Sequence, residues 1–196
     1  TRSKLIDPKI KESNWSENNI VREYYFTDGR KLIGNKRGKR YFVDYLLTYK
    51  NTNLAIIEAK AQTKDPLDGL QQSINYAQKL KIDFVYATNG DKTYEHSLME
   101  GSGKWIEEFP SSDELFERKF GQIQFKEEKV ITYPFYLSDK KPRFYQQIAV
   151  QKSIEAIANG KNRILLTLAT KTKKTYIAFQ IVYRLFASKW SKDGIG

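Results

Sequence analysis

Short runs of β-branched and aromatic residues alternate with helical patterns along the first two thirds of the chain. Bounded by turn-forming residues, such runs predict strands over residues 20–26, 41–49, 54–61, 83–87 and, on either side of a glycine turn, 94–106. Apolar residues recur every three or four positions between Pro66 and Lys81, which predicts an amphipathic helix. Shorter helices are predicted over 5–11 and after Ser111, whose side chain can cap a helix start. This order of elements predicts an α/β domain.

The last third of the chain has a different pattern. Residues 126–141 mix charged residues with tyrosine and proline without a sustained period, which predicts a linker. The pattern then predicts a helix, a short strand, a polar loop and a second helix, over residues 143–159, 163–168, 169–175 and 176–187. A strand, a loop and a helix in this order form the setting of a phosphate-binding loop. We therefore expect a first domain over 1–125 and the beginning of a second over 142–196.

Composition narrows the possible chemistry. The chain has no cysteine and one histidine, His96, which excludes disulfides, thiolate metal sites and multi-histidine metal sites. We expect His96 to be a surface or hydrogen-bonded residue without a special role. The 34 Lys and Arg against 23 Asp and Glu give a net charge of +11, which favours a polyanionic partner such as nucleic acid or an anionic membrane surface. No apolar run is long enough to cross a membrane, so a soluble, cytoplasmic protein is expected. Because Thr1 is not a translation start, we expect a piece of a longer chain.

Carboxylates and a lysine with a distinctive spacing lie on the two strands predicted within 41–61. Asp44 is followed by thirteen residues and then by Glu58-Ala59-Lys60. Alternation along a strand places Glu58 and Lys60 on one face. Residues 50–53 form a polar connection suited to a hairpin; an odd loop or a bulge brings Asp44 beside Glu58, and an even, unbulged loop separates them.

Two neighbouring carboxylates suit a hard cation such as Mg²⁺ or Mn²⁺. A lysine beside them could orient a metal-bound water or hold a phosphate oxygen, which points to phosphodiester hydrolysis. The alternative is a structural ion pair between Glu58 and Lys60.

This spacing resembles the catalytic motif of the PD-(D/E)XK nuclease superfamily, with Val43 in place of the proline. The surrounding sequence resembles the amino-terminal region of the motor and nuclease subunit of type I restriction enzymes, and the resemblance covers essentially the whole chain. The segments that carry it are Leu5-Ile6-Asp7-Pro8-Lys9-Ile10, Thr27-Asp28-Gly29-Arg30, Gln72-Ser73-Ile74-Asn75-Tyr76-Ala77 and Phe84-Val85-Tyr86-Ala87-Thr88-Asn89-Gly90. The resemblance implies a nuclease domain with a mixed central sheet flanked by helices.

The resemblance also implies roles for individual residues. Asp44 and Glu58 would bind the catalytic Mg²⁺, for which Mn²⁺ can substitute, and Lys60 would assist the attacking water. Gln72 and Tyr76, four residues apart on one helix face, would position DNA or the lysine; the alternative is an ordinary polar and half-buried pair. A glutamate that many superfamily members carry on the first helix would precede Thr1, so neither Glu17 nor Glu23 is a candidate for it.

For the whole subunit, the resemblance implies cleavage of double-stranded DNA at non-specific sites after ATP-driven translocation, in complex with methylation and specificity subunits. The alternative from another class is a non-catalytic DNA-binding or assembly module that keeps the nuclease fold.

A basic segment lies directly before the strand that carries Asp44. Six of the eleven residues from 30 to 40 are basic, and two are glycines. Lysine and arginine contacts to phosphate give affinity with little sequence preference, so we expect DNA contact here rather than only a solvated charge run. The residues concerned are Arg30, Lys31, Lys36, Arg37, Lys39 and Arg40.

Residues 166–175 resemble motif I of superfamily 2 helicases, but Lys171 and Lys173 replace its two glycines. Because glycine lets the backbone approach phosphate closely, these lysines should impair the cradle and disfavour a free-standing ATPase. Lys174 and Thr175 keep the positions that would meet phosphate and Mg²⁺, and Arg143 and Gln146 belong to a segment that resembles the upstream adenine-recognising motif. A vestigial ATP site, a deliberate substitution and a sequence error remain alternatives. This piece alone is not expected to translocate DNA.

Overall fold

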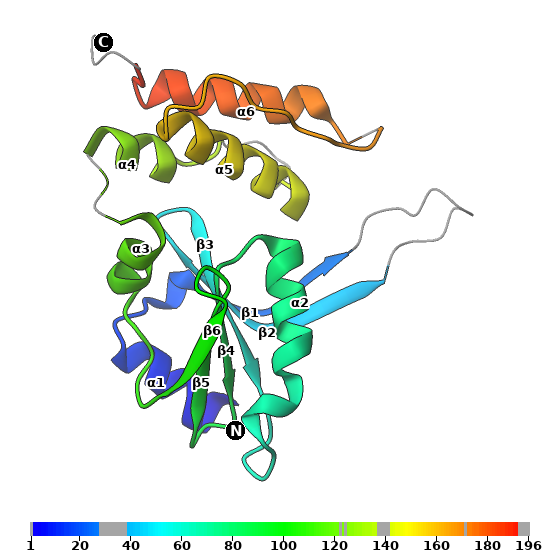
Figure 1. Cartoon of the computed structure of the whole chain (residues 1–196), viewed down its shortest axis with the longest axis vertical. Helices are drawn as coiled ribbons and strands as arrows, with labels where there is room; N and C mark the ends of the chain where they lie inside the picture. The colour runs from blue at the N-terminus through cyan, green and yellow to red at the C-terminus, as the bar shows by residue number, and fades with distance from the viewer. Residues whose placement is uncertain are drawn as a thin grey trace. The chain divides into compact units, whose positions relative to one another are not determined.

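The computed structural model describes residues 2–27, 39–121, 123, 125–136, 142–170 and 172–191. The chain divides into two compact units (Figure 1). The first comprises residues 1–49 and 53–121, and the second comprises residues 50–52 and 122–196.

A six-stranded mixed sheet forms the centre of the first unit, with its strands in sequence order from β1 to β6. Antiparallel pairs join β1 to β2, β4 to β5 and β5 to β6, whereas β3 and β4 are parallel. A helix between β3 and β4 makes the crossover that a parallel pair requires. The strands are β1 (Ile20–Thr27), β2 (Arg40–Tyr49), β3 (Thr52–Ala59), β4 (Phe84–Thr88), β5 (Thr93–Ser97) and β6 (Ser102–Ile106).

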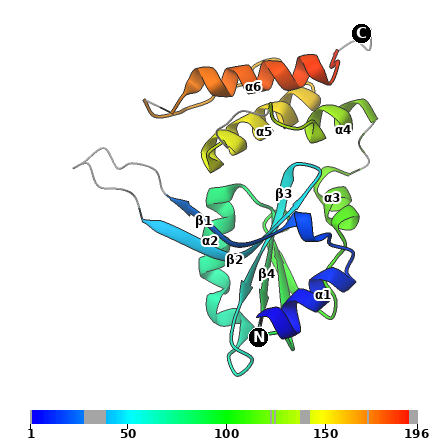
Figure 2. The ribbon, with the colours of Figure 1, turned by 180° about the vertical axis from the view of Figure 1, so that it is seen from behind.

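Helices cover both faces of this sheet. Short turns η1 (Arg2–Ile6) and η2 (Glu17–Asn19) flank α1 (Asp7–Glu12), and the turn η3 (Pro66–Gly69) leads into α2 (Leu70–Leu80). The two views show α1 and α2 on opposite faces (Figures 1 and 2). Helix α3 (Ser112–Phe120) begins as predicted, because the Ser111 hydroxyl accepts a hydrogen bond from the Glu114 amide at 3.2 Å.

The core of the first unit lies on both sides of β3 and β4. All five residues of β4 are buried, and so are Leu54 to Ile57 of β3. Strands covered on both faces have continuous apolar sequences rather than alternating ones, as seen here. The predicted α/β class and mixed sheet are confirmed.

The connection between β2 and β3 is shorter than predicted. Four residues, 50–53, were expected, but only Lys50 and Asn51 separate the strands, and β3 ends at Ala59 rather than at residue 61. Lys50 and Asn51 both have positive φ, 47° and 59°. Two successive residues of this kind match the twist of the flanking strands, and asparagine tolerates this conformation well.

The second unit contains three helices in its described part: α4 (Phe125–Thr132), α5 (Phe144–Ala158) and α6 (Lys174–Ala187). The helices predicted over 143–159 and 176–187 are thus present, and α4 begins one residue before the predicted linker range of 126–141 and occupies its first seven residues. The strand predicted over 163–168 is wrong, since no regular structure occurs there and Leu165 is 91% exposed. A strand needs a neighbour for its backbone hydrogen bonds, and the described part of this unit offers no other strand.

A buried arginine organises the helices of the second unit. Arg184 of α6 donates to the carbonyls of Val130 and Ile131 at the end of α4, and to Gln151 Oε1 of α5 at 3.0 Å. Burial lowers the pKa of Arg184 to about 10. A cation at the carboxyl end of a helix satisfies carbonyls that have no partner within the helix. Among the described residues, no helix has the length and apolar character needed to cross a membrane.

Candidate active site

The end of β3 carries the predicted glutamate and lysine in contact with each other. Lys60 Nζ lies 3.0 Å from Glu58 Oε1, with the two side chains 26% and 14% exposed. The two side chains therefore share a face, as the alternation predicted. The Lys60 amide donates to the Thr88 carbonyl at 2.8 Å, which continues the pairing with β4 beyond Ala59. This backbone bond fixes the segment from which Lys60 projects.

Asp44 reaches the same segment from β2. Its Oδ2 accepts a hydrogen bond from the Ala59 amide at 2.7 Å. The Ala59 amide thus donates to a side-chain carboxylate of β2 rather than to a backbone carbonyl of that strand. The turn between β2 and β3 has two residues. With a turn of this length and no bulge, regular pairing of the two strands would have separated Asp44 from Glu58. The hydrogen bond brings Asp44 to the residue next to Glu58.

An irregularity in β1 lies opposite Asp44. Arg22 pairs with Tyr45 and Tyr24 pairs with Val43, whereas the intervening Glu23 has φ of 52°. Left-handed backbone at a residue other than glycine is costly and uncommon in strands. The ladder is therefore distorted at the level of Asp44.

The side chains of β1 and β2 contact different helices on the two sides of Glu23. On one side of it, Arg22 and Tyr45 both contact Asp7 of α1. On the other side, Phe26 and Tyr41, which are paired across the strands, both contact the Tyr76 ring of α2. Regular alternation would have kept these two pairs on one face. The sequence offers no signal for this change, because glutamate is not a residue that favours positive φ.

Gly69, which precedes α2, lies against the end of Lys60. A Cβ atom at this position would be 2.5 Å from Lys60 Cε, 2.6 Å from Lys60 Nζ and 3.2 Å from Glu58 Cγ. Only a residue without a side chain leaves room for the ammonium group in this place. Gly69 is not among the site residues that the sequence predicts; its position at the start of the predicted helix is the available signal.

The donor set at the end of β3 fits a divalent cation that prefers oxygen. No group of three or more histidine, cysteine, aspartate and glutamate side chains forms a metal site in the described part of the chain. Mg²⁺ retains several waters and is commonly held by one or two carboxylates, so Asp44 and Glu58 suffice chemically. His96 lies on β5 opposite Val85 and is half-buried.

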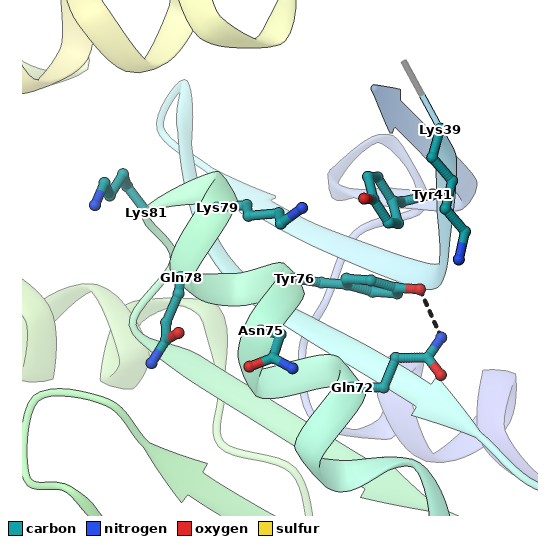
Figure 3. Close-up of a pocket in the computed structure, with 8 residues that line it drawn as sticks. All are labelled: Lys39, Tyr41, Gln72, Asn75, Tyr76, Gln78, Lys79 and Lys81. Atoms are coloured by element: carbon teal, nitrogen blue, oxygen red, sulfur yellow. Dashed lines mark hydrogen bonds between the residues drawn. The ribbon is translucent and has the colours of Figure 1, made fainter. Parts of the chain in front are cut away.

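Gln72 and Tyr76 lie on one face of α2, as their spacing predicted. Gln72 Nε2 donates to Tyr76 Oη at 2.6 Å. Both side chains line a hollow together with Lys39 and Tyr41 from the start of β2 (Figure 3). Gln72 and Tyr76 thus line the same hollow as Lys39, which belongs to the described end of the basic segment.

Most of that basic segment lies outside the described residues, which resume at Lys39. Arg30, Lys31, Lys36 and Arg37 are in this undescribed range. Arg40, the first residue of β2, is exposed.

In the second unit, the amide of Gln146 is engaged by the protein itself. Its Oε1 accepts from the Arg143 amide at 2.9 Å, and its Nε2 donates to the Thr172 carbonyl at 3.1 Å. Lys174 and Thr175 are exposed in the first turn of α6, and Lys171 lies outside the described residues. Lys173 has φ of 59° and ψ of 57°, a conformation that favours glycine.

The chain is similar to endonuclease subunits of type I restriction enzymes. Over 97% of its length it is 38% identical to the type I restriction enzyme EcoAI endonuclease subunit of Escherichia coli. It is also 24% identical, over 94% of its length, to the EcoKI endonuclease subunit of Escherichia coli strain K12. The chain is a homologue of these subunits. It spans about a quarter of their length, since the matches cover 25% and 21% of the two relatives.

A structural comparison finds a similar protein. A solved fragment of an HsdR-type subunit of a type I restriction enzyme from Vibrio vulnificus YJ016 matches with a TM-score of 0.89 and 36% identity. The match covers 99% of this chain and 39% of that one. Residues 139–194 also match the family described as Type III restriction enzyme, res subunit. The resemblance to the motor and nuclease subunit of type I restriction enzymes, stated from the sequence, is confirmed.

Proposed function

We propose that residues 1–125 of this R-subunit homologue form a Mg²⁺-dependent endonuclease domain of the PD-(D/E)XK type. The observation that supports this most is the convergence of three predicted residues: Asp44 is hydrogen bonded to Ala59, between Glu58 and Lys60, which are themselves paired. The chain's similarity to endonuclease subunits adds to it.

In this proposal, Asp44 and Glu58 hold Mg²⁺ or Mn²⁺, and the cation supplies Lewis-acid polarisation of the scissile phosphate. The protein contributes the positioning. The Ala59 amide orients the Asp44 carboxylate, and Glu58 keeps the Lys60 ammonium group beside the site. From that position Lys60 can donate to a phosphate oxygen or to an attacking water. The proposed reaction is hydrolysis of a phosphodiester bond.

For the whole enzyme, we propose non-specific cleavage of double-stranded DNA after ATP-driven translocation, with methylation and specificity subunits as partners. Residues 142–196 would begin a RecA-like helicase domain that uses ATP in the full-length subunit, an assignment supported by the family match over 139–194. The basic residues 30–40 and the net charge of +11 suit a DNA partner.

A second candidate is a non-catalytic DNA-binding or assembly module. The ion pair between Glu58 and Lys60 favours it, because such a pair can exist for structural reasons alone. Metal binding separates the two candidates.

The test is a calorimetric titration of the chain with Mn²⁺ and Mg²⁺ in the presence of DNA, compared with Glu58→Ala. Glu107→Ala, which removes an exposed carboxylate beyond β6, is the matched control. We expect binding by the parent and the control and none by Glu58→Ala. Equal binding by all three, or no binding by the parent, would support the module instead.

A further inference from the structure

The hollow beside α2 has a distinctive chemical lining. It has a volume of about 730 Å³ (Figure 3). It is lined by Lys39, which precedes β2, by Tyr41 at the start of β2, by residues of α2 and by Lys81. Three lysines, two tyrosines and three amide side chains make up this lining, and none of its residues is acidic. The α2 residues are Gln72, Asn75, Tyr76, Gln78 and Lys79.

The two tyrosines form an aromatic wall with a fixed backing. The rings of Tyr41 and Tyr76 lie 5.3 Å apart between centroids. Phe26 contacts both rings, at 5.2 Å from Tyr41 and 5.6 Å from Tyr76, and is itself buried. The Gln72 amide holds the Tyr76 hydroxyl at 2.6 Å. Rings supported in this way lose little freedom when a ligand packs against them.

Lysine side chains lie over this aromatic wall. Lys79 Nζ is 4.2 Å from the centroid of the Tyr41 ring, and Lys39 Nζ is 5.8 Å from it. Both lysines are exposed. Because both cations are exposed to solvent, they are held only weakly over the ring, and an anionic ligand can draw them away and leave the ring to another partner.

This combination suits an unpaired nucleotide strand. Lysines bind phosphates, tyrosine rings stack on bases of any sequence, and amides can hydrogen bond to base edges. In a duplex, each base already stacks on its neighbours, and enzymes that use the base itself must first take it out of the stack. An aromatic wall therefore distinguishes an opened strand from an intact duplex.

The hollow and the candidate active site share their supporting elements. Tyr41 precedes Asp44 by three residues of β2, which is about 10 Å of strand. On the other side, Gly69 lies against Lys60, and Gln72 follows Gly69 by about one helical turn.

We propose that this hollow binds a short unpaired stretch of the DNA strand next to the cleavage site, with phosphates on Lys39 and Lys79 and a base against Tyr76. This proposal rests on the proposed nuclease function and adds its substrate form: DNA that is locally opened at the cut.

The test measures fluorescence anisotropy of labelled oligonucleotides with the chain in the presence of EDTA, so that metal plays no part. A twelve-nucleotide single strand is compared with the duplex of the same sequence. We expect Tyr76→Leu to weaken single-strand binding about tenfold and duplex binding less than about twofold. Tyr76→Phe, which keeps the ring, should stay within about twofold of the parent for both. Lys79→Ala should weaken single-strand binding and lower its salt slope by about 0.7.

Lys104→Ala, an exposed lysine on β6, is the control for loss of one charge. Equal losses for Lys104→Ala and Lys79→Ala, or equal losses on single strand and duplex for Tyr76→Leu, would overturn the proposal. Competition by inorganic phosphate or a mononucleotide as effective as the oligonucleotide would assign the hollow to a free ligand and also overturn it. Circular dichroism of Tyr76→Leu checks folding, and if that variant unfolds, the comparison of Lys79→Ala with Lys104→Ala still tests the proposal.

Failure of this proposal is distinguishable from failure of the nuclease function. The single-strand preference needs no metal, and metal binding through Glu58 needs no intact Tyr76. If the single-strand preference is absent but metal binding is present, the assignment of the hollow is wrong. If metal binding is absent but the single-strand preference is present, the nuclease assignment is wrong.

Discussion

Single residues determine where the chemistry of this site can lie. Glu23, with its positive φ, distorts the ladder beside Asp44, and Gly69 leaves the space that the Lys60 ammonium group occupies. Neither residue carries a group that acts on phosphate. Their contribution is geometric, and substitution of Gly69 tests the geometry without removing any functional group.

Gly69→Ala should displace Lys60 with little effect on folding. The new methyl group would lie 2.5 Å from Lys60 Cε, and the end of a flexible lysine can move at small cost. We expect DNA cleavage by the restriction complex assembled with the full-length subunit to fall at least about tenfold, while the free energy of unfolding changes by less than about 1 kcal/mol. Asp68→Ala, the exposed neighbour, should leave cleavage unchanged. Unaltered cleavage by Gly69→Ala would show that the position of Lys60 is unimportant.

Lys173→Gly should stabilise the second unit. Lys173 is left-handed at the start of α6, which costs a residue with a side chain roughly 1 kcal/mol. We expect urea denaturation to show a gain of about 0.5–1 kcal/mol. Lys174→Gly, inside the first turn of the helix, should instead lose up to about 1 kcal/mol. A loss in both variants would argue against the left-handed conformation at Lys173.

At the scale of elements, a buried ionic network ties α3 to the sheet. Glu95 of β5 accepts hydrogen bonds from Tyr86 of β4 at 2.8 Å and from both terminal nitrogens of Arg118 of α3, at 3.0 and 2.7 Å. Burial alone would raise the pKa of Glu95, but the hydrogen bonds from Arg118 and Tyr86 outweigh it and the pKa is lowered. Burial, with the Glu95 charge as a smaller cause, raises the pKa of Tyr86.

This network predicts acid sensitivity. Because the folded pKa of Glu95 lies below its ordinary value of 4.5, its stabilisation is present above that pH and is lost as the pH falls through the folded pKa. In Glu95→Gln, the free energy of unfolding, measured by urea denaturation between pH 3 and 6, should change less with pH than in the parent. Arg118→Met should cost about 3 kcal/mol at pH 7 by leaving Glu95 unpaired. Glu107→Gln, an exposed control, should follow the parent, and a Glu95→Gln profile as steep as the parent's would contradict the assignment.

Most elements of the fold could be predicted from local patterns, and the exceptions have physical causes. The strands and helices from Ile20 to Phe120 follow apolar periodicity and caps, which are local properties. The strand expected around Leu165 depends on partners that local sequence does not supply. The two-residue turn at Lys50 and Asn51 needs positive φ at both residues, for which lysine gives no signal.

For the candidate site, sequence spacing predicted the residues but not the way they meet. Alternation was enough to place Glu58 beside Lys60, and helical spacing was enough to place Gln72 beside Tyr76. The approach of Asp44 depends on its hydrogen bond to Ala59, a contact between strands that no pattern within one strand encodes. The roles of these residues in catalysis stay predictions.

At the scale of the whole molecule, 34 basic residues stand against 23 acidic ones, and this excess would favour association with a polyanion such as the proposed DNA partner. Phosphate contacts release counterions, so affinity must fall steeply with salt. This electrostatic contribution to affinity is separate from metal binding and from stacking in the hollow, and it can be measured on duplex DNA alone.

If the six basic residues of 30–40 each contact a phosphate, duplex affinity should fall about a thousandfold between 50 and 200 mM salt. Replacing Lys31, Lys36 and Arg37 with glutamine should reduce the slope of log affinity against log salt by about 2.7. The control replaces Lys104, Lys129 and Lys189 with glutamine, which changes the net charge equally at exposed positions elsewhere. Equal slopes for the two triple variants would show that the basic segment has no special part in binding.

The hydrogen bond from the Ala59 amide to Asp44 also makes this amide a reporter. Its proton is held by a carboxylate rather than by a neighbouring strand carbonyl, so its resonance and its exchange with solvent depend on the state of that carboxylate. Binding of a divalent cation to Asp44 should shift the Ala59 amide signal and change its exchange rate, whereas the Lys60 amide, held by the Thr88 carbonyl, should change much less. Two adjacent amides can thus follow occupancy of the site in solution without any cleavage assay.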